Sequence, residues 1–330
     1  MAGLEMSVAT SGIESISPED GNEPLRDAIL IAGPTASGKS SLALAIARQT
    51  GAEIVNADSM QVYGVLGVLT ARPSPSEEAE RPHHFYGHVP PSTAYSTGQW
   101  LREVASLLAG ASDNGRRFVF VGGTGLYFRA LTGGLSEMPP VPAQVRQAWR
   151  ARLEEEGAGV LHALLSTRDA DAAARIGPAD GHRIVRALEV LEATGRPIGH
   201  WQARRGPSLV DPATARCLVI APDRALLRQR IDARFDAMVE TGAMDEVRAL
   251  MALGLDPALP AMKAIGVREL ADHLLGGSSL AQALERAKAA TRQYAKRQET
   301  WFRHQLGPDW LRTGSGDQLE SVLKEFSKPS

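Results

Sequence analysis

Residues 28–40 read AILIAGPTASGKS. The first five are apolar and partly β-branched, which is typical of a buried parallel strand. The next eight match G-x-x-x-x-G-K-[ST], and the residues from Lys39 to about Gln49 favour a helix that ends at Gly51. A strand, a glycine-rich turn and a helix in this order predict a loop that binds a di- or triphosphate.

Each part of this loop has an expected role. Backbone N–H groups converge on the anion, and the N-terminus of the helix adds partial positive charge. We expect Lys39 to reach the terminal phosphate oxygens and the Ser40 hydroxyl to ligate Mg²⁺. The expected phosphate-binding residues are Gly33, Pro34, Thr35, Ala36, Ser37, Gly38, Lys39 and Ser40.

The alternation of strands and helices around this loop predicts an α/β fold, a parallel sheet flanked by helices. Further strands are expected over residues 53–57, 118–121 and 217–221, with a loop over 71–97. The residues between the last two strands look almost wholly helical and predict an inserted domain, and the end of the chain is helical too. The expected parts are a disordered tail (1–26), the core (27–136 and 205–312), a helical insertion domain (137–204) and a second tail (313–330).

Polar residues follow two other strands of the expected sheet. The third strand runs into GGTG (122–125) without the carboxylate that would help to hold Mg²⁺ in an NTPase, whereas the second runs into DSMQ (58–61). Because ligands of such sheets bind beyond the carboxyl ends of the strands, we expect Asp58 and Thr124 to face the phosphate loop across one crevice. A turn-capping role for Asp58 and a plain turn role for Thr124 stay open as alternatives.

Composition restricts the other function classes. The 330 residues carry 36 Lys and Arg against 38 Asp and Glu, a formal net charge of −2, so strong non-specific attraction to polyanions is not expected. The single cysteine, Cys217, excludes an internal disulfide framework, and its apolar neighbours predict a buried thiol in a reducing, cytoplasmic setting. No apolar run reaches the roughly 20 residues that span a bilayer, so no membrane partner is expected. We expect a monomer.

Nine motifs occur in a fixed order along the chain. They are GPTASGKS (33–40), NADSMQVY (56–63), TARP (70–73), PHHF (82–85), VGGTGLY (121–127), RIVRALEV (183–190), EATGRP (192–197), IGVREL (265–270) and TRQYAKRQETWFR (291–303). Together they resemble the tRNA isopentenyltransferase family over about residues 28–305. The phosphate loop alone is unspecific, whereas the ordered set is highly specific.

The resemblance implies transfer of a dimethylallyl group from dimethylallyl diphosphate to the exocyclic amine of an adenosine. This adenosine lies on the 3′ side of the anticodon in tRNAs that read codons beginning with U. The phosphate loop would bind the diphosphate leaving group, with Mg²⁺ as cofactor and the tRNA anticodon stem-loop as partner. The implied tRNA-binding residues are Asp58, Ser59, Met60, Gln61, Thr124, Arg146, Arg183 and Arg186; for each arginine a solvated helix face is the alternative.

One segment departs from the family pattern. After Tyr63 the family often continues with Arg-Gly-x-Asp-x-Gly, whereas this chain has GVLGVL over residues 64–69. An Arg and an Asp are therefore missing, and any role for them is in doubt here. Arg72 keeps the basic character of the Lys that is usual in the TARP-like motif, and we expect it to add positive charge at the leaving group.

These expectations combine into a mechanism. An adenine amine is a weak nucleophile, so catalysis needs a clamp on the diphosphate, a proton acceptor and alignment of the two substrates. Lys39, Ser40 and Mg²⁺ would form the clamp, and Asp58 would act as general base. Thr35 and Thr124 would contact the diphosphate or the Mg²⁺ shell. Gln61 would check the edge of an adenine that is extruded from the anticodon loop.

Basic residues gather near the end of the chain. Residues 286–303 contain six Lys or Arg against one acid, and Lys288, Arg292 and Lys296 share one helix face. This stripe would suit a phosphate backbone, with a solvated face as the alternative. The adjacent His83 and His84 do not predict a metal site, because neighbouring side chains on a strand point to opposite faces.

Two other function classes fit part of the pattern. A small-molecule or nucleotide kinase shares the ATP-type phosphate loop and the α/β core, but it predicts ATP turnover without a tRNA substrate. The helical insertion and the DSMQ and GGTGLY motifs favour the transferase over this kinase. A non-catalytic RNA-binding protein leaves the phosphate loop unexplained.

Overall fold

The computed structural model describes residues 23–111, 114–314 and 317–326, and it contains a six-stranded sheet in which every pair of neighbours is parallel. The strand order is β3-β2-β4-β1-β5-β6. The strands are β1 (Ile29–Ala32), β2 (Glu53–Asn56), β3 (His83–His84), β4 (Phe118–Gly122), β5 (Arg216–Ile220) and β6 (Leu311–Thr313). The expected α/β class is confirmed.

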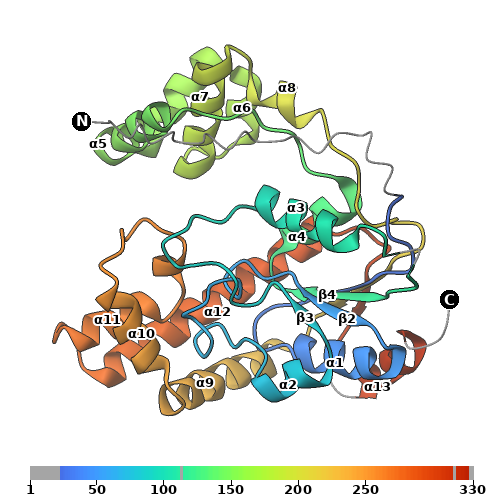
Figure 1. The fold of residues 1–330 in the computed structure, drawn as a ribbon. Helices are drawn as coiled ribbons and strands as arrows, with labels where there is room; N and C mark the ends of the chain where they lie inside the picture. Colours follow the sequence, from blue (N-terminus) through green and yellow to red (C-terminus); the bar gives the residue numbers. More distant parts are fainter. Residues whose placement is uncertain (1–22, 112–113, 315–316, 327–330) are drawn as a thin grey trace, which may run out of the picture. The chain divides into compact units, whose positions relative to one another are not determined.

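Helices precede, connect and follow these strands (Figure 1). They are α1 (Lys39–Thr50), α2 (Pro75–Glu80), α3 (Thr97–Leu108), α4 (Gly125–Gly133), α5 (Ala143–Arg168), α6 (Ala170–Arg175), α7 (Gly181–Thr194), α8 (Ile198–Gln202), α9 (Arg224–Glu240), α10 (Ala243–Ala252), the 3₁₀ helix η1 (Ala261–Lys263), α11 (Val267–Leu274), α12 (Leu280–Gln305) and α13 (Asp317–Phe326). The helix expected from Lys39 is α1, and it ends where Gly51 adopts a left-handed conformation.

The four central strands of the sheet, β2, β4, β1 and β5, are mostly buried because they are largely apolar and flanked by helices. One face packs Ile31, Ile54 and Val121 against Ile46 of α1 and Val322 of α13. On the other side of the sheet lies α3 (Figure 1), whose Trp100 donates from Nε1 to the carbonyl of Asn56 at 2.9 Å. The order β2-β4-β1-β5 therefore places the segments that follow these strands along one edge.

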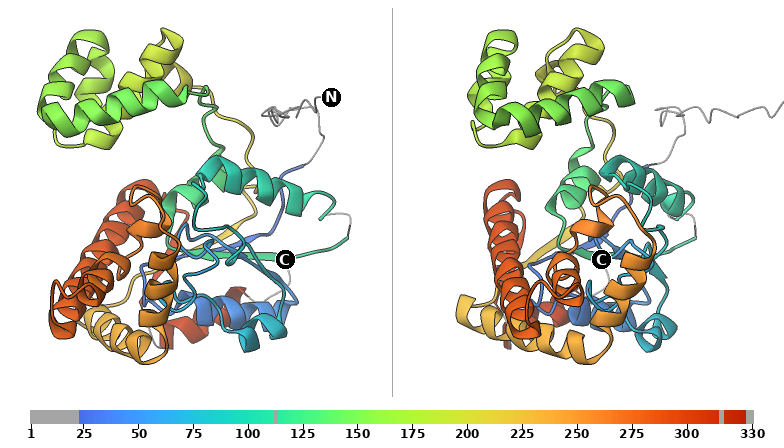
Figure 2. Two further views of the ribbon diagram at one scale, coloured as in Figure 1. Left: turned by 60° about the vertical axis from the view of Figure 1, so that its left-hand side comes forward. Right: turned by 90° about the vertical axis from the view of Figure 1, so that its left-hand side faces the viewer.

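The chain divides into two compact units, of which the first contains residues up to Tyr127 and from Leu209 onward. The second unit, Phe128–Ser208, contains the small helical bundle α5–α8 (Figure 2). It has its own apolar core, in which Trp149, Leu161, Leu165, Ile184 and Leu188 are buried. The first helix of this bundle, α5, has non-helical backbone angles at Gly157.

Three segments differ from the expectations. Leu25, placed in the disordered tail, is buried and forms a bridge with Val210, while residues 1–22 of that tail lie outside the described residues. The expected loop 71–97 contains α2 and β3. Beyond residue 312, the expected second tail contains α13, whose Phe326 is buried. These elements are short, so few apolar positions reveal them in the sequence.

The single cysteine of the chain, Cys217, lies in the first unit. Cys217 on β5 is free and buried as expected, and burial raises the pKa of its thiol to about 12. None of the described helices combines the length and the apolar character that crossing a membrane would require.

Candidate active site

The phosphate loop, residues 33–40, connects β1 to α1 and presents backbone N–H groups. Ala36 (φ 63°) and Gly38 (φ 92°) both adopt left-handed conformations, and no side chain caps the N-terminus of α1. The first N–H groups of a helix have no partner within it, so this geometry forms an anion cradle. At Gly33 a Cβ would stand 2.7 Å from the Ser37 hydroxyl, which explains why the loop opens on glycine.

Lys39 is buried at the base of the cradle and donates from Nζ to the carbonyl of Pro34 at 3.4 Å. Burial lowers the pKa of its ammonium group to about 8, with Asp58 opposing and Arg234 adding to this shift. The Ser37 hydroxyl is also buried and has no hydrogen-bond partner, whereas Ser40 is exposed. The loop therefore holds a cation whose charge an incoming anion would stabilise.

The turn that follows β2 is organised around Asp58 by its own side chains. Buried Asn56 donates from Nδ2 to the carbonyls of Asp58 (3.0 Å) and Phe85 (2.9 Å), and it accepts from the Asp58 N–H at 2.8 Å. The Asp58 carboxylate accepts from the Met60 N–H at 3.0 Å. This contact is one that the turn-capping alternative for Asp58 predicts. It uses only one carboxylate oxygen, and the second oxygen takes no part in it.

Thr124, in the turn after β4, contacts this same segment. Its hydroxyl accepts from the Ser59 N–H at 2.9 Å and donates to the Ser59 hydroxyl at 3.2 Å, and its N–H donates to the carbonyl of Ala57 at 3.1 Å. At the neighbouring Gly122 a Cβ would stand 2.0 Å from the carbonyl oxygen of Ala57. Thr124 thus supports the Asp58 turn, and its expected contact with the diphosphate or the Mg²⁺ shell stays a prediction.

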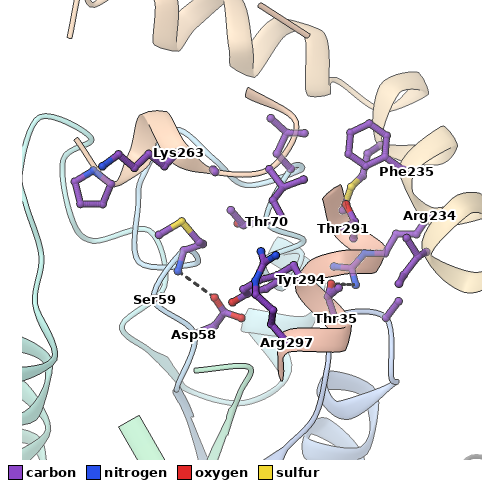
Figure 3. Close-up of a pocket in the computed structure, with 18 residues that line it drawn as sticks. Thr35, Asp58, Ser59, Thr70, Arg234, Phe235, Lys263, Thr291, Tyr294 and Arg297 are labelled. Atoms are coloured by element: carbon purple, nitrogen blue, oxygen red, sulfur yellow. Dashed lines mark hydrogen bonds between the residues drawn. The ribbon is translucent and has the colours of Figure 1, made fainter. Parts of the chain in front are cut away.

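A cavity of about 410 Å³ joins the phosphate loop to the Asp58 turn (Figure 3). Its wall on α9 is apolar, with Ile231, Phe235 and Met238, and its polar end has the Arg234 guanidinium, which donates to the Thr35 hydroxyl at 3.5 Å. All of its lining residues belong to the first unit. They are Thr35, Ala36, Asp58, Ser59, Met60, Leu69, Thr70, Ile231, Arg234, Phe235, Met238, Pro260, Lys263, Ala264, Ile265, Thr291, Tyr294 and Arg297.

Three cationic side chains and one tyrosine in the lining of this cavity were not expected at the site. Arg234 comes from α9, Lys263 from η1, and Tyr294 and Arg297 from α12. In the view of Figure 3, Tyr294 and Arg297 lie between Asp58 on one side and Thr35 and Arg234 on the other. Burial lowers the pKa of Arg234 and raises that of Tyr294.

Two expected site residues have other partners. Gln61 is buried, and its amide donates to the carbonyls of Thr70 and Ala71, both at 2.9 Å, so it fixes the segment beside the cavity instead of presenting its donors to a base. Arg72 donates to the carbonyl of Gly64 at 3.0 Å, and it is absent from the cavity lining. A Cβ on Gly87 would collide with its guanidinium, and a Cβ on Gly67 of the departing segment would stand 2.9 Å from Arg72 Nη2, so these two glycines make room for Arg72.

Two protein-family models match the sequence of this chain. A model described as IPP transferase matches residues 61–305, and one described as Isopentenyl transferase matches residues 26–85. The chain belongs to the IPP transferase family. The resemblance inferred from the ordered motifs is thereby confirmed.

Curated relatives match this chain along nearly their whole length. A tRNA dimethylallyltransferase of Mesorhizobium japonicum is 59% identical over 95% of this chain and 98% of its own, and one of Rhizobium meliloti is 58% identical over 89% and 97%. A solved eukaryotic dimethylallyltransferase acting on tRNA has a TM-score of 0.76 at 28% identity, covering 89% of this chain and 75% of its own. A tRNA isopentenylpyrophosphate transferase of Bacillus halodurans has a TM-score of 0.64 at 30% identity, covering 92% and 98%.

The three expected insertion arginines lie on the second unit. Arg146 on α5 is exposed. Arg183 on α7 is 71% exposed and lies 3.3 Å from Asp180, whereas Arg186 lies 3.4 Å from the buried carboxylate of Glu189. Arg146 and Arg183 are therefore available to a partner, while Arg186 is partly committed within its own helix.

The basic stripe of α12 has internal partners. Lys288 pairs with Asp236 at 2.6 Å and Arg292 with Asp232 at 2.5 Å, both on α9, and Lys296 is exposed. Of the aromatic residues, Phe302 is buried, and a Cβ on Gly125 would collide with the Trp301 ring. Two members of the stripe thus hold α12 on α9, which is not what a phosphate-binding stripe predicts.

The two adjacent histidines have partners close by. His83 contacts the carbonyl of Arg81 at 2.8 Å, and His84 contacts Glu53 at 2.7 Å. Glu53 also pairs with Arg116, and these bonds lower the pKa of the Glu53 carboxyl to about 2. In the described part of the chain, no group of three His, Cys, Asp or Glu is placed to hold a metal ion.

Proposed function

We propose that the chain transfers a dimethylallyl group from dimethylallyl diphosphate to the exocyclic amine of the adenosine 3′ of the anticodon. Its substrates would be tRNAs that read codons beginning with U, and it would release diphosphate. One observation carries the proposal: a single cavity is lined by the phosphate loop, by an apolar wall and by Asp58. Family membership supports the same chemistry.

The polar end of the cavity suits the diphosphate. The N–H groups of the loop, Lys39 and Arg234 supply positive charge where the leaving group gains negative charge, and the buried setting strengthens each contact. The apolar wall of Ile231, Phe235 and Met238 suits the hydrocarbon part of the donor. When the donor binds in this way, the carbon–oxygen bond that breaks lies between the cations Lys39 and Arg234 and the apolar wall.

The other side of the cavity suits the acceptor. As the amine nitrogen bonds to the allylic carbon, the carbon–oxygen bond of the donor breaks and its electron pair leaves with the diphosphate. Asp58 takes the proton that the amine loses, and the hydrogen bonds of Asn56 hold its backbone for that task. The target base would be extruded from the anticodon loop to reach Asp58.

The residues at the loop fit Mg²⁺. Ser40 offers an exposed hydroxyl oxygen beside the cradle, and the described residues hold no cluster of three metal ligands, which suits an ion held mainly by substrate phosphates and water. When bound, Mg²⁺ would neutralise charge on the diphosphate. We further propose that the protein is a cytoplasmic monomer that contacts the tRNA through Arg146 and Arg183.

The activity can be tested with dimethylallyl diphosphate, Mg²⁺ and a synthetic anticodon stem-loop that carries adenosine 3′ of the anticodon. We expect the RNA to gain the mass of one dimethylallyl group, and a stem-loop with guanosine at that position to gain none. Phosphate release from ATP is measured in parallel. If the RNA stays unchanged and ATP is hydrolysed, the transferase function would be contradicted and the kinase function favoured.

A further inference from the structure

Gln298 on α12 is a buried polar residue that joins both halves of the site. Its Oε1 accepts from the N–H of Thr35 at 3.0 Å, and its Nε2 donates to the carbonyl of Gly123 at 2.9 Å. The first contact holds the phosphate loop and the second holds the turn after β4. The bond to Gly123 is buried and the bond to Thr35 is partly buried, and losing a partner in such surroundings is costly.

The first contact affects which groups of the loop face the anion. With the Thr35 N–H directed to Gln298, the N–H groups at the N-terminus of α1 are left to the diphosphate. The hydroxyl of Thr35 also accepts a hydrogen bond from the guanidinium of Arg234. Gln298 thus orients Thr35, a loop residue that also bonds to Arg234, one of the cations of the cavity.

The second contact reaches Asp58 through the turn after β4. Gly123 precedes Thr124, which binds Ala57 and Ser59 on either side of Asp58. A Cβ on Gly123 would stand 2.1 Å from Gln298 Nε2 and 3.0 Å from Asp58 Oδ2, so the three groups are in close contact. A shift of the Gln298 amide would therefore also displace Thr124, which supports the turn that carries the Asp58 carboxylate.

We propose that Gln298 is a positioning residue that sets the spacing between the bound diphosphate and Asp58. Its amide is a rigid plane with an acceptor at one corner and a donor at the other, so it can hold the two turns at one separation. Reaction needs the amine, held by Asp58, close to and aligned with the allylic carbon, held by the diphosphate. This role rests on the proposed function, because only a two-substrate transfer needs that spacing.

The test compares Gln298→Met, which keeps the length and removes both hydrogen bonds, with Gln293→Met on the exposed face of the same helix. Single-turnover rates are measured at saturating donor and stem-loop, and pyrophosphate affinity is measured by calorimetry. For Gln298→Met we expect a rate loss of about 100-fold, since small misplacements are that costly. Pyrophosphate affinity should change less than about threefold, because Lys39 and the helix N–H groups remain. Gln293→Met should match wild type in both.

A second measurement separates positioning from loss of folding. Melting temperatures are recorded for both variants, and if Gln298→Met unfolds at the assay temperature, the isosteric Gln298→Glu is used. It keeps the acceptor for Thr35 and loses the donor to Gly123, so we again expect the rate to fall with little change in pyrophosphate affinity. An unchanged rate, or equal losses of rate and pyrophosphate affinity, would overturn the proposal. Absence of transfer by the wild-type protein would instead contradict the proposed function.

Discussion

The two turns that meet at the cavity are built by opposite means. The phosphate loop shapes its cradle with backbone, using left-handed Ala36 and Gly38 and a helix N-terminus, and few of its side chains are committed. The Asp58 turn is shaped by side chains, above all by Asn56 and Thr124, which bond to the backbone around the carboxylate. An anion is bound well by many N–H groups, whereas a proton acceptor needs one oxygen in one place. Substitutions on the two sides should therefore affect different kinetic constants.

The largest effect should come from Asp58→Asn. The amide cannot accept the proton of the amine, so we expect kcat to fall about 1,000-fold, within the range typical of a general base. Pyrophosphate affinity, measured by calorimetry, should stay close to wild type, because the donor side is untouched. A parallel loss of donor affinity would move Asp58 from base to Mg²⁺ ligand.

The second effect concerns Lys39, and it should act on donor binding. Lys39→Met should weaken pyrophosphate binding about 100-fold, whereas Lys296→Met on the exposed part of α12 should not. In the wild-type protein, the lysine charge is present below its pKa of about 8 and is lost above it. Pyrophosphate binding near pH 8 should therefore take up protons, and this uptake should be absent in Lys39→Met. Equal uptake by both proteins would contradict the assignment.

A smaller effect is expected from Asn56→Ala, which removes side-chain support from the Asp58 turn. The variant leaves the Phe85 carbonyl and the backbone of Asp58 without their buried partner, so we expect about 3 kcal/mol less stability and a kcat about tenfold lower. Chemical denaturation and steady-state kinetics measure the two changes. The exposed Asn114→Ala is the control, and an Asn56 variant with normal kcat would show that the loop and the turn are equally tolerant.

The smallest effect on catalysis should come from Lys288→Met, outside both turns. Because Lys288 pairs with Asp236 on α9, the variant should melt at a lower temperature but bind the stem-loop with unchanged affinity and salt dependence. Arg183→Ala, on the second unit, should reduce the salt dependence instead, because this arginine is mostly exposed. Filter binding at several salt concentrations distinguishes the two, and the reverse pattern would restore α12 as the RNA-binding stripe.

The sequence predicted those parts of the site that depend on local pattern. The loop 33–40 and the DSMQ segment each follow an apolar strand, and parallel strands bring such segments to one edge. Arg234 and Gln298 could not be placed in this way, since they reach Thr35 from 199 and 263 positions away. The stripe on α12 was misinterpreted because helix periodicity gives a shared face but not the acids of α9 opposite it.

The fold shows the same division. Strands of four or five apolar residues were expected close to their observed places, while β3, with two residues, and β6, with three, were not. The helix α13 was missed because its contacts with the core involve few residues, among them Val322 and Phe326. Such elements owe their structure to packing against the rest of the chain and have little periodicity of their own.

The glycines after β4 set a practical boundary for protein engineering. Any side chain at Gly122, Gly123 or Gly125 would collide with Ala57, Gln298 or Trp301 respectively, so a mutant library covering this turn would consist mainly of inactive clones. The α9 wall of the cavity differs, because Ile231, Phe235 and Met238 line it with apolar side chains whose sizes set the open space, and of these Ile231 and Phe235 also belong to the apolar core. A search for variants that accept bulkier or shorter prenyl donors should therefore randomise these three positions and leave the glycine turn unchanged.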